Sequence, residues 1–149
     1  MPFMHRRKLI KVIDPVKIKE AIRAAEKQTS GEIRVSITRF FWGKVRPVAE
    51  KAFTRLGMTH TKQRNGILFF LVPSRRRFVV LGDEGIHAAV GQGFWEHLAA
   101  TMSVEFKKGR FQEGLIRGIE EAGEHLADHF PYDPLTDKNE LPDDVDFRK

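Results

Sequence analysis

Acidic and amide side chains beside glycines are the residues of this sequence best suited to chemistry. They fall in three separate segments: Gly31-Glu32, Asn65-Gly66 and Gly82-Asp83-Glu84-Gly85. Carboxylate and amide oxygens are the hard ligands that calcium and magnesium prefer, and glycines let backbone carbonyls approach an ion closely. The candidate metal ligands are Glu32, Asn65, Asp83 and Glu84.

Arg64 directly precedes Asn65, and its guanidinium could hold a phosphate through two parallel hydrogen bonds. A bound metal would then polarise a phosphoryl oxygen or activate water, with one of Asp83 and Glu84 ligating it and the other accepting a proton. An alternative stays open, in which Asp83-Glu84 is a solvated turn and Glu32 pairs with a nearby arginine. Full burial of Glu32 against Arg64 would favour that alternative.

Two apolar runs around a short basic turn must position these groups. Residues 67–72 form a run of six large apolar residues, which is too short to span a bilayer and indicates a strand buried on both faces. Pro73-Ser74 and three arginines interrupt the chain before a second apolar run at residues 78–81. The pattern predicts a β-hairpin, which places Asn65-Gly66 beside residues 82–85.

The remaining periodic segments predict one more strand and several helices. Alternation of Ile33, Val35 and Ile37 predicts a half-buried strand over residues 32–38. Asp14-Pro15 supplies a cap and a first position for a helix. Helices are predicted over residues 15–28, 47–56, 94–106 and 111–130, with a short helical turn at 86–90.

The order of these elements predicts an α/β fold, with a small mixed sheet, part parallel and part antiparallel hairpin, sandwiched between helices. The strand–helix–strand unit between residues 32 and 72 should form a parallel pair with a right-handed crossover. Glu32, Asn65 and Asp83 then fall at the same edge of the sheet, together with Ser30-Gly31.

Composition is typical of a single-domain globular protein. The chain has 149 residues, of which 41% are hydrophobic and 31% charged. The absence of cysteine excludes disulfides, zinc–thiolate sites and thiol nucleophiles. We expect a basic segment at 1–13, one domain at 14–131 and an acidic tail at 132–149. Neither a secretory signal nor a transmembrane stretch is evident, so a cytoplasmic location is expected.

Charge and aromatic residues suggest a second surface. The net charge is +6, and a basic body could attract phosphate-rich partners. Arg75-Arg76-Arg77 and Phe40-Phe41-Trp42 are expected at the sheet edge opposite the carboxylates. Together they could bind nucleic acid or an anionic membrane surface, although a solvated turn over a local apolar cluster is the more ordinary interpretation. Binding of nucleic acid is therefore not expected.

Established hydrolase signatures are absent. Gly91-Gln92-Gly93 lacks the Gly-Lys-Ser/Thr ending of a phosphate loop. His125 and His129 are four residues apart and could hold a transition metal, but a helix end that favours cations is the simpler explanation. Ser30 and Ser36 have no neighbouring histidine to activate them, so the catalytic residues stay unknown.

The segments that carry the rim residues resemble the TPM domain family, named for a thylakoid acid phosphatase, a photosystem II repair protein and a receptor-modulating protein. The matching stretches are residues 24–33, 65–68, 82–85, 106–109 and 114–115. Their order and spacing make the match fairly specific, and the likeness covers most of residues 15–130.

Two departures from the family pattern matter. Arg64 stands where many members carry an aspartate, and Gly82-Asp83-Glu84-Gly85 where many have Gly-Tyr-Gly. The chain looks like a soluble subgroup with Arg-Asn-Gly and Gly-Asp-x-Gly-Ile patterns. Either Asp83 and Glu84 replace the acid lost at Arg64, or the metal site is altered.

The resemblance implies a small α/β sandwich of Rossmann-like appearance that binds a divalent cation, often calcium. It implies phosphatase or nucleotide-hydrolysing activity in some members and accessory or assembly roles in others. The leading expectation is therefore a domain that binds calcium or magnesium, with weak metal-dependent activity on a phosphoester or nucleotide. The alternative is a non-enzymatic interaction module that binds a protein or membrane-protein partner through the basic, aromatic edge.

Overall fold

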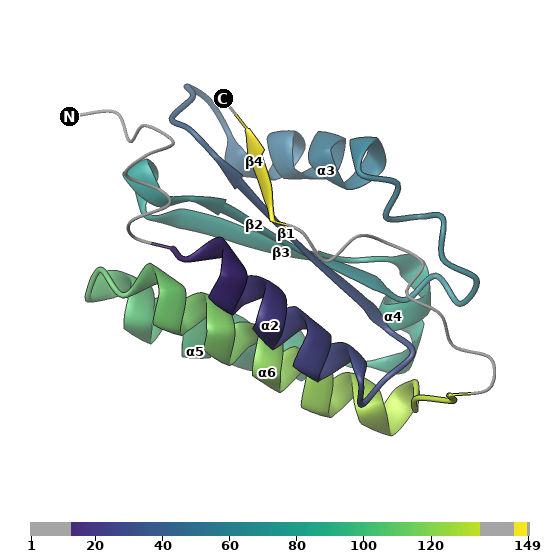
Figure 1. The fold of residues 1–149 in the computed structure, drawn as a ribbon. Coiled ribbons are helices and arrows are strands. Elements are labelled where there is room, and N and C mark those ends of the chain that lie inside the picture. Colours follow the sequence, from purple (N-terminus) through teal and green to yellow (C-terminus); the bar gives the residue numbers. More distant parts are fainter. Residues whose placement is uncertain (1–12, 135–144, 149) are drawn as a thin grey trace.

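The structure, a computed structural model, describes residues 13–134 and 145–148 (Figure 1). This part of the chain forms five α-helices, one 3-10 turn and four strands, which confirms the predicted α/β class. In chain order these are α2 (Pro15–Glu26), β1 (Glu32–Thr38), α3 (Val45–Arg55), β2 (Gly66–Val72), η1 (Pro73–Arg75), β3 (Arg77–Gly82), α4 (Glu84–Ala89), α5 (Gln92–Lys107), α6 (Phe111–His129) and β4 (Asp146–Arg148).

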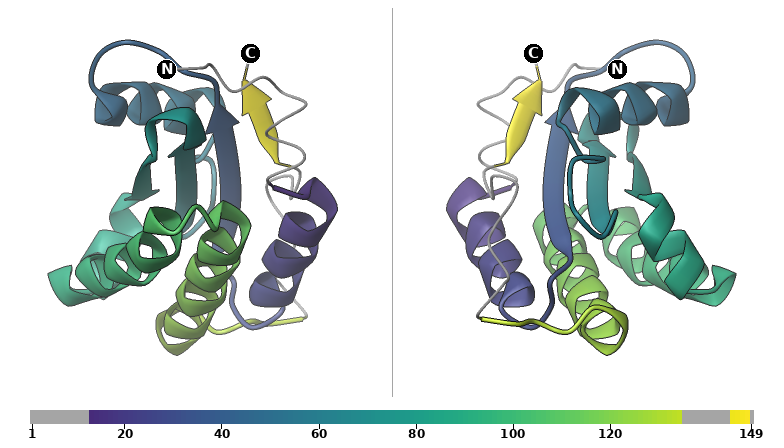
Figure 2. Two further views of the ribbon diagram at one scale, coloured as in Figure 1. Left: turned by 90° about the vertical axis from the view of Figure 1, so that its left-hand side faces the viewer. Right: turned by 90° about the vertical axis from the view of Figure 1, so that its right-hand side faces the viewer.

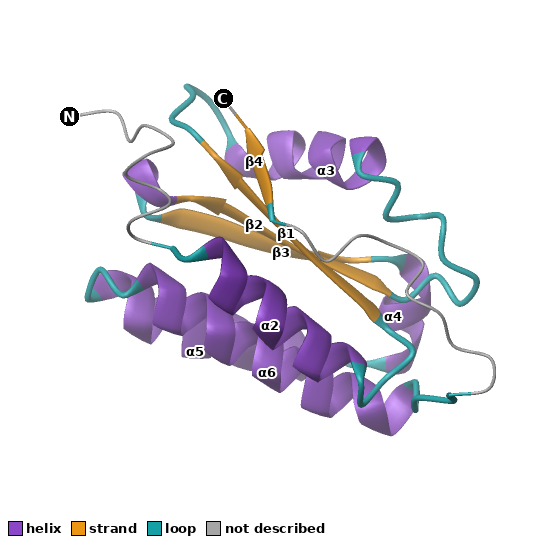
Figure 3. Ribbon diagram, viewed as in Figure 1, coloured by secondary structure: helices purple, strands orange, loops and turns teal. Residues whose placement is uncertain are grey.

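The four strands form one mixed sheet in the order β3-β2-β1-β4 (Figure 3). β1 is parallel to β2 and to β4, and β3 returns antiparallel to β2. The predicted parallel pair and hairpin are both confirmed. The antiparallel return places Gly82 opposite Ile67, close to the start of β2.

β4 is an element that the sequence interpretation missed. Residues 146–148 pair with Ser36–Thr38 at the sheet edge, whereas the sequence pattern placed them in a polar tail. A strand of three residues with one apolar side chain, Phe147, is too short to show a period of two. The basic cluster at residues 5–8 and the acidic residues at 135–144 lie outside the described part of the chain, and the domain boundaries stay predictions.

Local sequence explains where the helices begin. Asp14 caps α2 through a hydrogen bond from the Val16 amide to its Oδ1 at 3.0 Å. α3 begins at Val45, two residues earlier than predicted, with Pro47 in its first turn. Proline is tolerated there because the first amides of a helix have no partner within the helix.

The sheet separates two apolar cores, and β2 contributes to both. Every residue of β2 is buried. Ile67, Phe69 and Leu71 pack in the core with α2, α5 and α6, whereas Leu68, Phe70 and Val72 pack in the core with α3. Figure 2 shows the three helices on one face of the sheet and α3 on the other. Burial of each large apolar side chain contributes roughly 1.5–3 kcal/mol to folding, so β2 holds the two layers together.

Helix α6 lies close to both of its neighbours because it carries glycines at the contacts. A Cβ at Gly123 would lie 2.8 Å from the Ala25 Cβ of α2, and one at Gly118 would lie 2.7 Å from the Met102 Sδ of α5. Such close approach leaves no room for a side chain at either glycine. None of the helices in the described residues is both long and apolar enough to cross a bilayer.

Candidate functional site

Glu32, Asn65 and Asp83 lie at one end of the sheet, where chain direction predicted them. Glu32 pairs with Gly66, and its amide donates to the Asn65 carbonyl at 3.3 Å. The Asp83 amide donates to the Gly66 carbonyl at 3.0 Å, and Glu84 follows as the first residue of α4. The fold therefore brings the four predicted ligands to one rim, while their role as metal ligands stays a prediction.

The Arg64 guanidinium binds both acidic side chains of the Asp83-Glu84 pair. Its Nε and Nη2 donate to the two Asp83 oxygens at 2.5 and 2.9 Å, and Nη1 lies 3.1 Å from Oε1 of Glu84. The hydrogen bond with Asp83 raises the pKa of Arg64 above its ordinary value, so the guanidinium stays charged. The Arg64 guanidinium, predicted from the sequence as a phosphate-binding group, is thus bound to the Asp83 carboxylate in this structure.

A tight loop fixes the backbone of Arg64. Its φ of 52° lies in the left-handed region, and its carbonyl accepts a hydrogen bond from the Gly85 amide at 2.9 Å. A Cβ at Gly85 would lie 2.2 Å from the Gln63 carbonyl oxygen and 2.6 Å from that of Arg64. The first turn of α4 can therefore approach the loop only because residue 85 is a glycine.

Asn65 presents a buried acceptor at the same rim. The residue is 1% exposed, and its Nδ2 donates to Ser30 Oγ at 3.3 Å. Its Oδ1 accepts no hydrogen bond from the residues that the structure describes. A buried oxygen in this condition costs about 1–3 kcal/mol, which a water molecule or a cation would offset.

Glu32 is the third carboxylate of the rim and is only 3% exposed. Alternation along β1 directs it to the same face as Arg34, whose Nη1 donates to the Leu56 carbonyl at 3.3 Å. Glu32 is therefore buried, as the alternative of a non-metal rim expects. Arg64, however, binds Asp83 and Glu84.

A cation, the Arg64 guanidinium, already lies between the acidic side chains of this rim. Within residues 13–134 and 145–148, no three His, Asp or Glu side chains form a group that could hold a metal ion. The rim offers two carboxylates that share the charge of Arg64, together with the Asn65 oxygen. A calcium or magnesium ion between Asp83 and Glu84 would therefore have to displace the guanidinium.

A pocket of about 320 Å³ is lined by three histidines, and sequence spacing alone had connected only two of them. His97 of α5 lines it with His125 and His129 of α6. His97 Nε2 lies 3.4 Å from Oε1 of Glu121, and His125 contacts the Phe94 ring edge-on. Among the described residues these histidines do not form a group that could hold a metal ion.

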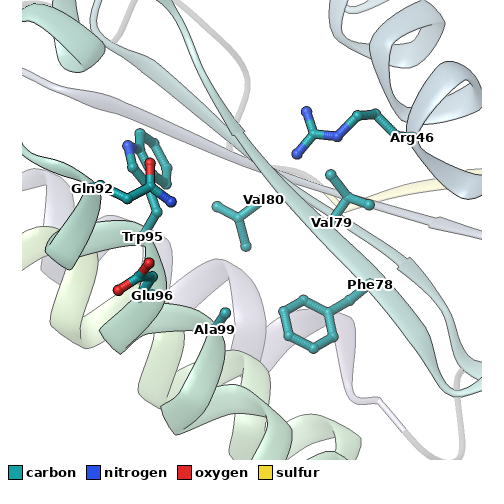
Figure 4. Close-up of a pocket in the computed structure, with 8 residues that line it drawn as sticks. All are labelled: Arg46, Phe78, Val79, Val80, Gln92, Trp95, Glu96 and Ala99. Carbon is teal, nitrogen blue, oxygen red and sulfur yellow. The ribbon is translucent and has the colours of Figure 1, made fainter.

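Another pocket, of about 310 Å³, lies along β3 between α3 and α5 (Figure 4). Arg46 and Val79 lie on one side of the strand, and Phe78, Val80 and Trp95 on the other. Its lining holds one carboxylate, that of Glu96, and lacks a serine or histidine. Its lining therefore contains no pair of acid and base groups of the kind that hydrolysis uses.

Basic and aromatic residues meet at the opposite end of the sheet from the carboxylates. Arg75 Nη1 donates to the Phe41 carbonyl at 3.1 Å. Its guanidinium carbon lies 5.8 Å from the centroid of the Phe40 ring and 5.2 Å from that of Phe41, distances typical of cation–π contact. Trp42 follows and is 85% exposed.

Comparison with known proteins identifies the family. The sequence profile of the TPM domain matches residues 7–125. The chain is similar to the solution structure of the BA42 protein from the psychrophilic bacterium Bizionia argentinensis, with 38% identity, 93% coverage of each chain and a TM-score of 0.85. Among curated proteins no match was found.

A more distant structural likeness shows the fold alone. The N-terminal domain of the cg2496 protein from Corynebacterium glutamicum is 12% identical, with 87% of this chain and 75% of that chain covered and a TM-score of 0.59. The profile match spans more than half of the sequence and includes every residue of the carboxylate rim. The chain therefore belongs to the TPM domain family.

Proposed function

We propose that this TPM domain binds a divalent cation, calcium or magnesium, which replaces the Arg64 guanidinium between Asp83 and Glu84. The observation that carries the proposal is that two carboxylates from adjoining residues already share one cationic group at 2.5–3.1 Å. Hard oxygen donors of this kind suit calcium and magnesium. The buried Asn65 oxygen, which accepts no hydrogen bond from the described residues, would contribute a third protein ligand.

Exposure makes this exchange of cations feasible. The Arg64 side chain is 39% exposed and that of Glu84 is 72% exposed, whereas that of Asp83 is 6% exposed. The exposed contact with Glu84 contributes little, so the main cost of moving Arg64 into solvent is the loss of its two hydrogen bonds to the buried Asp83 carboxylate, which the incoming ion would replace. Asp83 would remain in place, since it also accepts a hydrogen bond from the Glu84 amide at 2.8 Å and caps α4.

Calcium titration by calorimetry tests the proposal. Asp83→Asn keeps a capping side chain but removes the charge, and we expect it to abolish binding. Arg64→Gln removes the competing cation, and we expect it to tighten binding by about three- to tenfold. Asp128→Asn, at an exposed acid of α6, is the matched control and should leave binding unchanged. Weaker binding by Arg64→Gln, or unchanged binding by Asp83→Asn, would contradict the exchange.

Hydrolysis of a phosphoester or nucleotide is a further part of this proposal. Once released from Asp83, the Arg64 fork could bind a phosphate bidentately, and the bound ion would supply Lewis-acid polarisation of a phosphoryl oxygen. Phosphate release from ATP and from p-nitrophenyl phosphate, with and without calcium or magnesium, provides the test. Rates that Asp83→Asn leaves unchanged would end the enzymatic part of the proposal and leave cation binding untouched.

A non-enzymatic interaction module is the second candidate function. The observation that favours it is the meeting of cations and aromatic rings at the other end of the sheet, remote from the carboxylates. A variant without the Glu32, Asp83 and Glu84 carboxylates should then keep its binding to an acidic surface. Loss of that binding while the fold is retained would count against the candidate.

A further inference from the structure

The basic tip, defined as residues 39–46 and 73–77, has a net charge of +6, equal to that of the whole chain. It contains six cations and no acid: Arg39, Lys44, Arg46, Arg75, Arg76 and Arg77. Removing these six from the 26 basic residues leaves 20, which equals the number of acidic residues. The rest of the chain is therefore neutral in sum, while the tip is a cluster of one sign.

The cations of the tip lack counter-ions among the residues that the structure describes. The ion pairs of the described residues involve none of these six cations. Arg39, Lys44, Arg76 and Arg77 are all exposed. Cations without counter-ions at one end of the sheet create a local positive potential that attracts an anionic surface.

Trp42 adds an apolar group in the middle of this charge. It is 85% exposed, far more than packing against its neighbours would leave, and its ring meets Phe40 edge-on at 4.7 Å. Gly43 follows with φ 103°, which turns the chain sharply after the tryptophan. The loop thus presents an indole at its outer surface, and tryptophan is enriched where an apolar ring can sit at a membrane–water interface.

We propose that the basic tip docks on an anionic lipid surface, with Trp42 entering the interface and the arginines contacting headgroups. The proposal rests on the interaction-module candidate and is independent of the cation site. The tip suits lipid better than nucleic acid, because Arg75 lies over the Phe40 and Phe41 rings and Trp42 meets Phe40 edge-on. Base stacking needs several open ring faces along a groove.

Co-sedimentation with vesicles tests the proposal. Wild-type protein should bind vesicles of phosphatidylcholine with one quarter phosphatidylglycerol and should not bind vesicles of phosphatidylcholine alone. Binding should weaken between about 50 and about 300 mM NaCl, because screening shortens the reach of the surface charge. Entry of Trp42 into the interface should shift its fluorescence to shorter wavelength, and Trp42→Ala should weaken binding while Trp42→Phe retains most of it.

Matched variants separate the tip from overall charge. Arg76→Gln with Arg77→Gln should weaken binding by about 25-fold, since each cation near an anionic leaflet contributes about fivefold. Lys27→Gln with Lys51→Gln removes the same charge from exposed positions elsewhere and should have little effect. Tyr132→Ala, at an aromatic residue that is 44% exposed, is the control for Trp42→Ala.

Three outcomes would overturn the proposal. The first is equal binding to neutral and anionic vesicles, and the second is equal loss in the tip pair and the lysine pair. The third is tighter binding to a single-stranded RNA oligonucleotide than to vesicles at the same salt concentration, which would assign the tip to nucleic acid and leave the interaction candidate standing. Failure to bind vesicles, RNA and an acidic peptide alike would remove both lipid docking and the interaction-module candidate. Asp83→Asn, which alters the proposed cation site at the other end of the sheet, should change none of these results.

Discussion

Gly85 shows at the scale of one residue how the carboxylate rim is held. The Arg64 carbonyl accepts a hydrogen bond from the Gly85 amide, and the same backbone positions the guanidinium that binds Asp83. A methyl group at residue 85 would meet two backbone carbonyl oxygens, which cannot rotate away as a flexible side chain can. The geometry of the rim therefore depends on a residue with no side chain.

We predict that Gly85→Ala destabilises the fold by about 1–3 kcal/mol, because the loop must shift to admit the methyl group. Gly93→Ala is the control, because a Cβ there meets nothing within 4 Å and the residue is the second of α5. It should leave the free energy of unfolding unchanged or raise it by less than the roughly 1 kcal/mol of a helix interior. Urea denaturation measures both changes, and a neutral Gly85→Ala would show that the loop adapts freely.

β4 illustrates at the scale of an element how charge attaches a short strand. Three residues provide little apolar burial, but Asp146 Oδ2 accepts hydrogen bonds from Ser36 Oγ at 2.8 Å and Arg55 Nη2 at 2.9 Å. Burial of the Asp146 carboxylate opposes its ionisation, yet the hydrogen bonds from Arg55 and Ser36 outweigh this effect and lower the pKa of Asp146. The strand is thus connected to both β1 and α3 through one carboxylate.

Acid should loosen β4. Because the pKa of Asp146 is lower in the folded protein, its contribution is fully present above the ordinary aspartate pKa of about 3.9 and is lost as pH falls through the lowered value. The protection factor of the Phe147 amide, which corrects the exchange rate for the intrinsic effect of pH, should therefore decrease between about pH 5 and about pH 2. Asp146→Asn should show low protection already at neutral pH, without this acid transition. Asp128→Asn should behave as wild type, and an acid transition that survives in Asp146→Asn would contradict the assignment.

At the scale of the whole molecule, β2 connects two cores that would otherwise be independent layers. Helix α3 cannot leave the sheet without exposing Leu68, Phe70 and Val72, and the other helices cannot leave without exposing the alternate residues. The two ends of the sheet also differ chemically, because one carries carboxylates and the other carries cations without counter-ions. Cation binding and lipid docking, as proposed here, would therefore occur without competing for the same residues.

We predict a single cooperative unfolding transition, because both cores lose their packing when β2 is lost. In urea, far-ultraviolet circular dichroism and tryptophan fluorescence should give the same midpoint. Trp42→Phe makes the fluorescence report on Trp95 alone, which packs against the core formed with α2, α5 and α6. Two separated midpoints would show that the α3 layer melts on its own.

Sequence patterns sufficed for the elements whose periodicity is strong. The buried run at residues 67–72 and its return at 78–81 predicted the hairpin, because few structures other than a doubly buried strand accommodate six consecutive large apolar residues. Chain direction then placed Glu32, Asn65 and Asp83 at one rim. Periodicity did not detect β4, whose few residues are held in place only by partners 91 or more positions away along the chain.

What the sequence determined by itself is therefore the α/β class, the direction of the main strands and the end of the sheet at which the acidic residues gather. These features follow from local burial patterns and short connections, which act over a few residues at a time. Only the tertiary structure decided that Arg64 binds Asp83 and Glu84 and leaves Glu32 to another environment. That choice depends on a left-handed backbone at Arg64 and on a close approach at Gly85, which arise only when distant segments pack together.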